Sequence, residues 1–208
     1  MPLPRRGLYA ITSAAICRNL DTLLRAVSQA IEGGTVIVQY RDKLNDAATR
    51  QHQAQRVQAL CREAGVLFIL NDGPAAAVAE ASFDGMHLGD SDGAVAEARQ
   101  CCPGVVIGAT CGQSLERALL AQAAGASYVA FGAFHPSSTK PLALRATPAL
   151  LVEARRRLHL PICAIGGITP ENAAPLIAAG ADYLAAVEGV FGAPDVTAAA
   201  RAYARLFV

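Results

Sequence analysis

The sequence predicts an α/β fold, a (β/α)8 TIM barrel of eight parallel strands each followed by a helix, in a single domain over residues 1–208. Short β-branched runs alternate strictly with longer alanine-rich stretches of helical period, and this alternation predicts a parallel sheet covered by helices. The count of eight favours a closed barrel over the main alternative, an open doubly wound sheet. The turn after the first strand, Thr12-Ser13-Ala14-Ala15, also lacks the Gly-x-Gly-x-x-Gly pattern of dinucleotide-binding open sheets.

The predicted strands are short runs rich in β-branched and aromatic residues, and Gly, Asp, Asn or Pro separates them from the helices. In chain order they are expected at 8–12, 35–40, 66–70, 85–88, 105–108, 128–132, 162–165 and 183–187. The alanine-rich stretches between them repeat their apolar residues with a helical period. Helices are expected near 21–32, 46–64, 74–82, 93–101, 114–124, 147–158, 170–179 and 195–206.

Turn residues support several of these boundaries. Thr147 and Thr169 each precede a proline, an arrangement that is typical of a helix start. Gly65, Gly125 and Gly180 each follow a predicted helix, where a left-handed cap residue ends the helix before the next strand.

The composition is that of a globular chain without a bias toward a charged partner. Of the 208 residues 53% are hydrophobic and 17% are charged, and the formal net charge is +1. This balance excludes a disordered chain, and without a Lys/Arg block it offers no electrostatic footprint for nucleic acid. No run approaches the roughly 18 apolar residues of a membrane span, and residues 1–6 lack the apolar core of a signal peptide. We therefore expect a cytoplasmic protein with small-molecule partners and neither nucleic-acid nor membrane partners, and whether it forms a homo-oligomer is left open.

The cysteines are expected to be core residues. They are Cys17, Cys61, Cys101, Cys102, Cys111 and Cys163. A metal site needs a tighter grouping than theirs, and a disulfide framework is typical of short secreted chains. We expect reduced thiols that pack as small apolar side chains.

Unexpected polar residues follow seven of the eight predicted strands. They lie in the segments 39–43, 71–72, 87–92, 108–112, 132–140, 166–169 and 187–189. Because the carboxyl ends of all barrel strands meet on one face, we expect an active site there, with His87 facing it from a strand end.

Two of these segments have the chemistry of a phosphate site. The run Ser-Ser-Thr-Lys at 137–140 offers hydroxyls, loop amides and an ammonium group, although a polar surface loop has the same composition. The pair Gly166-Gly167 opens the loop after the seventh strand and precedes a helix, which is the usual place of a phosphate in such barrels.

Asp72 and Asp92 follow adjacent predicted strands. Either aspartate alone is explained as a turn or helix cap. Together with Arg41, Lys43 and Lys140, however, they favour a Mg²⁺ ion that bridges carboxylates to a polyphosphate. Neither a Gly-x-Ser-x-Gly nor a His-Glu-x-x-His motif occurs, so no protein nucleophile is indicated.

These residues, in this order, resemble the thiamine-phosphate synthase (thiamine-phosphate pyrophosphorylase) family over nearly the whole chain. Its sharpest motifs are at 38–43 (Val-Gln-Tyr-Arg-Asp-Lys), 71–72 (Asn-Asp), 85–89 (Gly-Met-His-Leu-Gly, with Asp92), 137–140 (Ser-Ser-Thr-Lys) and 164–168 (Ala-Ile-Gly-Gly-Ile). The resemblance implies an enzyme, a transferase on a (β/α)8 barrel with Mg²⁺ as cofactor. Such an enzyme joins 4-amino-2-methyl-5-hydroxymethylpyrimidine diphosphate to 4-methyl-5-(2-phosphoethyl)thiazole, and it releases thiamine phosphate and diphosphate.

The resemblance also implies roles for individual residues. Those expected at the pyrimidine diphosphate are Gln39, Tyr40, Arg41, Asp42, Lys43, Asn71, Thr110 and Lys140. Those expected at the thiazole phosphate are Ser137, Ser138, Thr139, Gly167, Val187 and Glu188. Asp72 and Asp92 match the magnesium ligands, and we add His87 to the substrate-binding residues from its place at a strand end.

The implied chemistry explains why no nucleophile is found. Diphosphate departs from an electron-rich aminopyrimidine methylene group, and the thiazole nitrogen then attacks the resulting cation. Catalysis would rest on neutralising the leaving group and on positioning two substrates. The residues expected to be catalytic are Arg41, Lys43, Lys140 and Thr110.

A few positions depart from the family pattern. Glu188 stands where the family usually has a small serine, and a carboxylate aimed at the thiazole phosphate would repel it by about 1–4 kcal/mol. Asp90 replaces a usual glutamine, and His135 replaces a usual apolar residue. The stretch between Asp72 and Asp92 is slightly longer than the common pattern, and the motif register makes Asp92 the second metal ligand. None of these changes removes a diphosphate or magnesium group.

Three alternative functions compete with the synthase. A thiazole tautomerase-like isomerase has the same fold, but it generally lacks the paired aspartates and the loop lysine, and its catalytic histidine would fall near Gly112. Asp72, Asp92 and Lys140 all stand here, which favours the synthase. A non-catalytic phosphate-ligand sensor is favoured only by Glu188. Another phosphate-binding barrel, of amino-acid biosynthesis, would leave the aspartates without a metal role.

Overall fold

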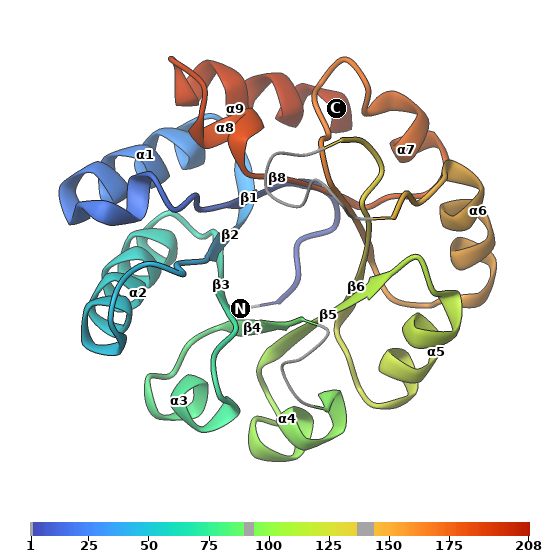
Figure 1. The fold of residues 1–208 in the computed structure, drawn as a ribbon, viewed down its shortest axis with the longest axis horizontal. Helices are drawn as coiled ribbons and strands as arrows, with labels where there is room; N and C mark the ends of the chain where they lie inside the picture. The colour runs from blue at the N-terminus through green and yellow to red at the C-terminus, as the bar shows by residue number, and fades with distance from the viewer. Residues whose placement is uncertain (1, 90–93, 137–143) are drawn as a thin grey trace.

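The computed structural model describes residues 2–89, 94–136 and 144–208, and these form the closed barrel that the sequence predicts (Figure 1). The strands pair in sequence order from β1 to β8, and β8 pairs with β1 to close the sheet. Every pair of neighbours is parallel. The strands are β1 Gly7–Ile11, β2 Thr35–Tyr40, β3 Leu67–Asn71, β4 Gly85–Leu88, β5 Val106–Gly112, β6 Tyr128–Phe131, β7 Ile162–Ile165 and β8 Tyr183–Ala186.

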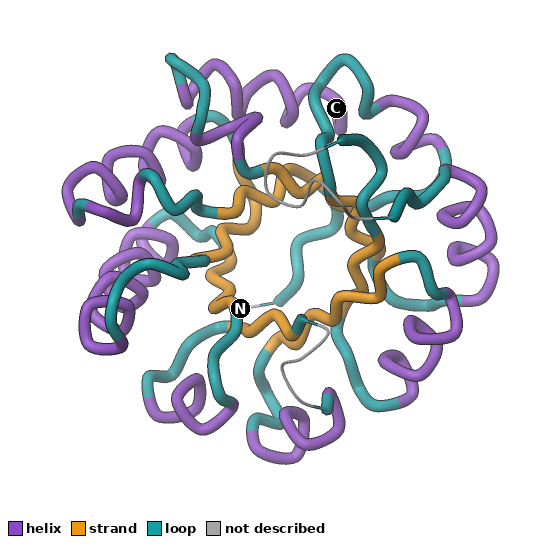
Figure 2. Tube along the Cα trace, in the orientation of Figure 1, coloured by secondary structure: helices purple, strands orange, loops and turns teal. Residues whose placement is uncertain are grey.

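Helices form a ring outside the sheet (Figure 2). They are η1 Ile16–Arg18, α1 Leu20–Glu32, α2 Ala47–Glu63, α3 Ala75–Glu80, α4 Val95–Cys101, α5 Leu115–Ala123, α6 Pro148–Arg157, α7 Ala174–Ala178, α8 Glu188–Phe191, α9 Val196–Ala204 and η2 Arg205–Phe207. Gly65, Gly125 and Gly180 have φ values of +69°, +93° and +109°, which confirms the predicted left-handed caps.

The main differences from the predicted elements lie near the mouth of the barrel. The helix predicted from residue 170 begins only at Ala174, because the side chain of Asn172 folds the preceding segment into a turn. Its Oδ1 accepts from the amide of Thr169 at 2.8 Å, and its Nδ2 donates to the carbonyl of Gly167 at 3.0 Å. The short helix α8 was not predicted, and β5 continues to Gly112 because Thr110 and Gly112 still pair with β6.

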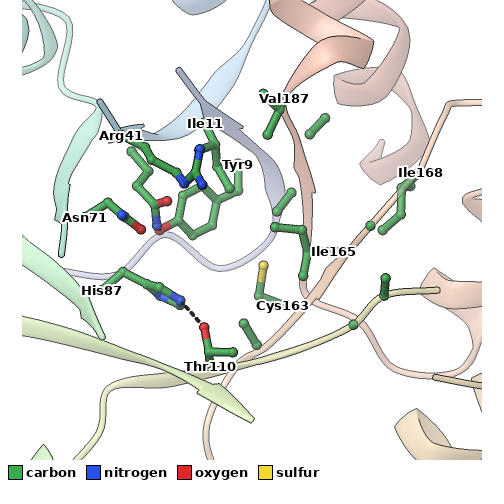
Figure 3. Close-up of a pocket in the computed structure, with 18 of the residues that line it drawn as sticks. Tyr9, Ile11, Arg41, Asn71, His87, Thr110, Cys163, Ile165, Ile168 and Val187 are labelled. Atoms are coloured by element: carbon green, nitrogen blue, oxygen red, sulfur yellow. Dashed lines mark hydrogen bonds between the residues drawn. The ribbon is translucent and has the colours of Figure 1, made fainter. Parts of the chain in front are cut away.

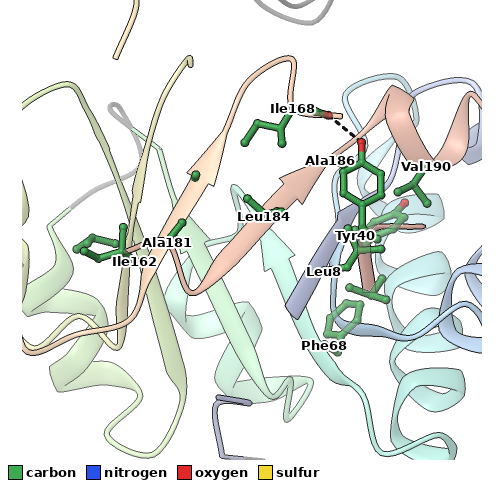
Figure 4. Close-up of a cluster of buried hydrophobic side chains, with 14 of the residues drawn as sticks. Leu8, Tyr40, Phe68, Ile162, Ile168, Ala181, Leu184, Ala186 and Val190 are labelled. Carbon is green, nitrogen blue, oxygen red and sulfur yellow. Dashed lines mark hydrogen bonds between the residues drawn. The ribbon is translucent and has the colours of Figure 1, made fainter. Parts of the chain in front are cut away.

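Alternation along the strands divides the buried side chains into two layers. One layer fills the barrel itself and includes Tyr9, Ile37, Ile69, Tyr128 and Tyr183. The other layer, part of which is drawn in Figure 4, lies between the sheet and the helices. The small alanines of this second layer let the helices pack closely on the sheet.

The amino-terminal segment closes one end of the barrel. Leu3 packs against the interior layer, the hydroxyl of Tyr183 donates to the carbonyl of Pro4, and Arg6 donates to the carbonyl of Ala181 at 3.4 Å. The opposite end, at the carboxyl ends of the strands, holds the large cavity described below.

Two further predictions concern membranes and thiols. Within the described residues, no helix combines the length and the apolar character that crossing a membrane requires. All six cysteines are free thiols; five are buried as predicted, whereas Cys101 is exposed.

Candidate active site

A cavity of about 780 Å³ opens at the carboxyl ends of the strands. Side chains from all eight strands or from the loops that directly follow them line it. The structure therefore brings most of the described candidate residues together. They are Gln39, Arg41, Lys43, Asn71, Asp72, His87, Thr110, Gly167, Val187 and Glu188.

The cavity has two unlike walls (Figure 3). The wall formed by β2 to β5 is polar and cationic, with Gln39, Arg41, Lys43, Asn71, Asp72, His87 and Thr110. The wall formed by β6 to β8 and their loops is mostly apolar, with Ala130, Ala133, Cys163, Ile165, Ile168, Ala185, Ala186 and Val187. Such a cavity suits a charged ligand on one side and a more apolar ligand on the other.

Arg41 is held at the cavity through its backbone by Thr12, the residue that follows β1. The fully buried hydroxyl of Thr12 accepts from the amide of Arg41 at 2.8 Å and donates to its carbonyl at 3.0 Å. This double hydrogen bond fixes the start of the loop after β2, so the guanidinium extends into the cavity from a rigid base (Figure 3).

Tyr40 and Asp42, two residues expected at the substrate, do not line the cavity. Gln39 faces the barrel interior, and strand alternation therefore turns Tyr40 outward. Its hydroxyl lies 2.9 Å from Oε1 of Gln53 and 3.2 Å from Oδ2 of Asp42, and it donates its single proton to these two oxygens in turn. Asp42 is also buried, and its carboxylate accepts from the backbone amides of Leu44 and Asn45. Both residues shape the loop that presents Arg41 and Lys43.

The environment of Asp42 keeps its carboxylate charged. Burial disfavours the charged form, but the N–H groups of Leu44 and Asn45 and the Tyr40 hydroxyl together outweigh it and lower the pKa of Asp42. A charged Asp42 therefore accepts several hydrogen bonds within one tight turn, which is a structural role.

Lys43 and Asp72 form an ion pair at the mouth of the cavity. Lys43 Nζ lies 3.3 Å from Asp72 Oδ2. Asp72 has a φ of +53°, in the left-handed region that aspartate and asparagine tolerate better than most residues. Its carboxylate lines the cavity directly after Asn71, the last residue of β3.

His87 and Thr110 are joined across the floor of the cavity. His87 Nε2 and Thr110 Oγ1 are hydrogen-bonded at 2.9 Å (Figure 3). His87 Nδ1 is hydrogen-bonded to the hydroxyl of Tyr128 at 2.9 Å. Tyr128 in turn bonds to Tyr9, which accepts from Gln39. Sequence reasoning missed both tyrosines. The signal that could have found them is strand parity, because Tyr9 and Tyr128 lie on the inward side of β1 and β6.

Glycines allow the loop after β7 to approach the cavity closely. Gly166 and Gly167 have φ values of +105° and +59°, and a Cβ on Gly167 would lie 2.1 Å from the carbonyl oxygen of Pro136. Only glycine fits there.

The carbonyl groups of this loop accept hydrogen bonds from other segments, whereas two of its amides have no such partner among the described residues. The carbonyl of Gly166 accepts from the amide of His135, that of Gly167 from Asn172, and that of Ile168 from the hydroxyl of Tyr203 at 2.8 Å (Figure 4). Among the hydrogen bonds of the described residues, none uses the amide of Gly167 or Ile168. Backbone amides whose neighbouring carbonyls are bonded elsewhere are suited to an anionic ligand.

Glu188 does not aim its carboxylate at this loop. It is the first residue of α8 and is exposed, and its Oε2 lies 2.7 Å from the position a Cβ on Gly192 would occupy. The side chain thus runs along α8, and the repulsion expected from the sequence is screened by solvent.

Several expected residues lie outside the described ranges. They are Asp92, Ser137, Ser138, Thr139 and Lys140, together with Asp90. Within residues 2–89, 94–136 and 144–208, no cluster of three or more His, Cys, Asp or Glu side chains is arranged to hold a metal ion.

The chain is similar to several known proteins. A family model described as thiamine monophosphate synthase matches residues 8–190. Thiamine-phosphate synthase of Methylococcus capsulatus is 52% identical over 208 residues, which cover 100% of this chain and 92% of that protein. The same enzyme of Aromatoleum aromaticum is 51% identical and covers 97% and 96% of the two chains. Among solved structures, thiamine phosphate pyrophosphorylase from Pyrococcus furiosus has a TM-score of 0.86 and 30% identity, over 97% of this chain and 95% of its own.

Proposed function

The chain belongs to the thiamine monophosphate synthase family, whose members are transferases of thiamine biosynthesis, and we propose that it joins 4-amino-2-methyl-5-hydroxymethylpyrimidine diphosphate to 4-methyl-5-(2-phosphoethyl)thiazole. The products would be thiamine phosphate and diphosphate. The observation that carries this choice of substrates is the division of one cavity into a cationic polar wall and an apolar wall with a glycine loop.

The polar wall supports binding of the pyrimidine diphosphate. Arg41 and Lys43 supply cationic donors for its phosphate oxygens, and Asn71 adds an amide. Gln39 and Thr110 offer neutral polar groups deeper in the cavity, where they suit the ring. Lys140, outside the described residues, would add a further cation.

The described donor set fits Mg²⁺ through Asp72. Carboxylate oxygens are the ligands that this hard cation prefers, and one or two of them suffice because waters and substrate phosphates complete its shell. Asp72 lines the cavity beside Lys43, and we propose that it holds the ion together with Asp92, which lies outside the described ranges. When bound, the ion supplies neutralisation of the charge that develops on the leaving diphosphate.

The apolar wall supports binding of the thiazole phosphate. Ile165, Ile168 and Val187 offer an apolar surface for the thiazole ring. The amides of Gly167 and Ile168 suit its phosphate, because the carbonyls on either side of them are bonded elsewhere. Segment 137–139, outside the described residues, would complete this phosphate site.

The chemistry of the described lining supports a dissociative substitution. Cys163 is the one thiol among the described residues that line the cavity, and burial raises its pKa, so it stays protonated and is unsuited to act as a nucleophile. We therefore propose that the bond to diphosphate breaks first, assisted by Arg41 and Lys43. The thiazole nitrogen then attacks the methylene carbon, held near it by the two walls.

The alternative isomerase is disfavoured at Gly112. This residue lines the cavity at the place where a tautomerase would carry its catalytic histidine, and it offers no side chain. The sensor alternative has less support than it had from the sequence, because Glu188 is exposed and directed along α8.

Release of diphosphate separates these functions. Purified protein is incubated with both substrates and Mg²⁺, and then with each component omitted in turn. We expect diphosphate only in the complete mixture, whereas an isomerase or a sensor releases none. Arg41→Gln should slow release by about 100-fold. Arg50→Gln, an exposed change in α2, is the matched control and should leave the rate unchanged.

The cellular location and the partners are also part of the proposal. A cytoplasmic location is consistent with the free thiols, because a reducing compartment keeps them so. The proposed partners are the two small-molecule substrates.

A further inference from the structure

A chain of hydrogen bonds runs through the floor of the cavity and links five strands. Gln39 Nε2 donates to the hydroxyl of Tyr9 at 2.8 Å, and the hydroxyls of Tyr9 and Tyr128 are 2.7 Å apart. His87 lies 2.9 Å from Tyr128 through Nδ1 and 2.9 Å from Thr110 through Nε2. Both ends of the chain, Gln39 and Thr110, line the cavity, whereas its middle member Tyr128 does not.

The fold holds Tyr128 rigidly in the centre of the barrel. The side chain is fully buried, its ring stacks on His87 at a centroid distance of 5.6 Å, and it meets Tyr9 edge-on at 5.9 Å. Gly108 of β5 makes room for it, because a Cβ there would lie 2.1 Å from Cζ of Tyr128. The hydroxyl is therefore fixed in place and has little freedom to find other partners.

The hydroxyl groups of the chain stay neutral. Burial raises the pKa of both Tyr9 and Tyr128 well above the ordinary value of 10.0. Each hydroxyl therefore carries one proton to donate, and each needs an acceptor in this buried place.

With Nε2 of Gln39 facing Tyr9, these protons can be satisfied in one direction. Tyr9 accepts from Gln39, so its own proton has Tyr128 as acceptor, and the proton of Tyr128 then goes to Nδ1 of His87. His87 must carry its proton on Nε2 and donate it to Thr110. In the opposite direction the proton of Tyr9 would need Oε1 of Gln39 as its acceptor, which requires the Gln39 amide to be turned over from the orientation seen here.

The direction of the chain determines what the cavity presents to a ligand. Thr110 accepts from His87, so its hydroxyl proton is left to donate into the cavity. Gln39 donates to Tyr9 through Nε2, so its Oε1 is left as an acceptor. A ring that carries both a donor amine and an acceptor nitrogen, as an aminopyrimidine does, matches this pair.

We propose that the five side chains form a hydrogen-bond chain of fixed direction, and that Tyr128 is a positioning residue that sets the donor and acceptor offered to the pyrimidine half of the reaction. This inference rests on the proposed function for the identity of the ring. The direction of the hydrogen-bond chain does not depend on the proposed function, and it can be measured in the protein without substrates.

The first test reads the proton of His87 by NMR in substrate-free protein with ¹⁵N-labelled histidine. The resonances of His87 are those that disappear in His87→Gln. We expect a neutral ring with its proton on Nε2 in the wild type. A proton on Nδ1, or a charged ring at neutral pH, overturns the proposed direction.

The second test removes the middle hydroxyl with Tyr128→Phe, which keeps the ring. We expect the KM for the pyrimidine diphosphate to rise about tenfold, the value of one lost hydrogen bond, and the KM for the thiazole phosphate to stay within about twofold. In Tyr128→Phe the ring of His87 should no longer carry its proton on Nε2 alone, and the ¹⁵N spectrum should show protonation at both nitrogens. Tyr183→Phe is the control, because Tyr183 is also a buried interior tyrosine but its hydroxyl bonds to Pro4 and takes no part in the hydrogen-bond chain. It should change neither the KM values nor the protonation of His87.

The outcomes separate this inference from the proposed function. Equal changes in both KM values, or an unchanged His87 pattern in Tyr128→Phe, overturn the positioning role. If the wild type makes no thiamine phosphate while His87 carries its proton on Nε2, the proposed function fails, but the proposed direction of the hydrogen-bond chain stands.

Discussion

Lys43 and Asp72 come from the loops after two adjacent strands, and Lys43 Nζ and Asp72 Oδ2 meet at 3.3 Å at the mouth of the cavity. Both side chains are partly exposed, so the pair adds little to the stability of the fold. Under the proposed function its role is chemical, because the pair places a cation and a carboxylate where the diphosphate and a Mg²⁺ ion would meet.

Replacing the carboxylate of Asp72 should therefore affect turnover and leave folding intact. Asparagine is the suitable substitute, because it tolerates the left-handed backbone at a φ of +53°. We expect Asp72→Asn to lower kcat/KM by about 100-fold or more, with partial recovery at high Mg²⁺, while the free energy of unfolding changes by less than about 1 kcal/mol.

Asp21→Asn, an exposed acidic residue in the first turn of α1, is the control for this change. It should leave the Mg²⁺ dependence as in the wild type. Full activity of Asp72→Asn at low Mg²⁺ would exclude Asp72 as a metal ligand.

Thr12 positions Arg41 through a single hydroxyl, and Thr12→Val removes that hydroxyl at nearly constant volume. The amide and carbonyl of Arg41 then lose a partner, so we expect a loss of about 1–3 kcal/mol in urea unfolding and a higher KM for the pyrimidine diphosphate. Thr12→Ser keeps the hydroxyl and should restore the KM. If valine and serine behave alike, the hydroxyl does not position Arg41.

Gly167 is required both for its backbone conformation and for space, and Gly65 provides a control for the first effect. The two glycines have φ values of +59° and +69°, but a Cβ on Gly65 would meet nothing within 4 Å. Gly65→Ala should therefore cost only about 1–2 kcal/mol of backbone strain.

Gly167→Ala adds a clash with the carbonyl of Pro136 and should displace the loop after β7. We expect a larger loss of stability than in Gly65→Ala and a rise of about tenfold or more in the KM for the thiazole phosphate. A KM for this substrate equal to that of Gly65→Ala would argue against a phosphate site at this loop.

Asp42 should make the stability depend on pH. Its pKa lies below the ordinary value of 3.8 in the folded protein, so the carboxylate contributes stability above that value and loses it as pH falls through the lowered folded-state pKa. We expect Asp42→Asn to be less stable than the wild type by about 1–3 kcal/mol at pH 7 and the difference to shrink below pH 3.8. Urea unfolding at both pH values measures this, and an equal difference at both contradicts it.

Much of the fold could be predicted from the sequence because strands and helices differ in period and turn residues separate them. The bounds of β2, β4 and β7 match the prediction residue by residue. The late start of α7 could not be read in this way, because it depends on a side chain, Asn172, that bonds to Gly167 and thereby competes with the helix signal of the preceding proline.

The candidate site was predicted less completely, for two physical reasons. A run of polar residues does not tell which of them face the cavity, and alternation turned Tyr40 outward while Gln39 faces inward. The buried partners of His87 depend on contacts between distant strands, which no local pattern encodes. Tyr128 and Tyr9 are 119 residues apart and yet share a hydrogen bond.

Formation of thiamine phosphate tests the proposed function most directly. Purified protein, shown by circular dichroism to be folded, is incubated with the pyrimidine diphosphate, the thiazole phosphate and Mg²⁺, and thiamine phosphate is measured by mass spectrometry. We expect thiamine phosphate and diphosphate in equal amounts, and a greatly reduced yield of both with Asp72→Asn. A folded wild-type protein that forms no thiamine phosphate from these substrates would contradict the proposed function.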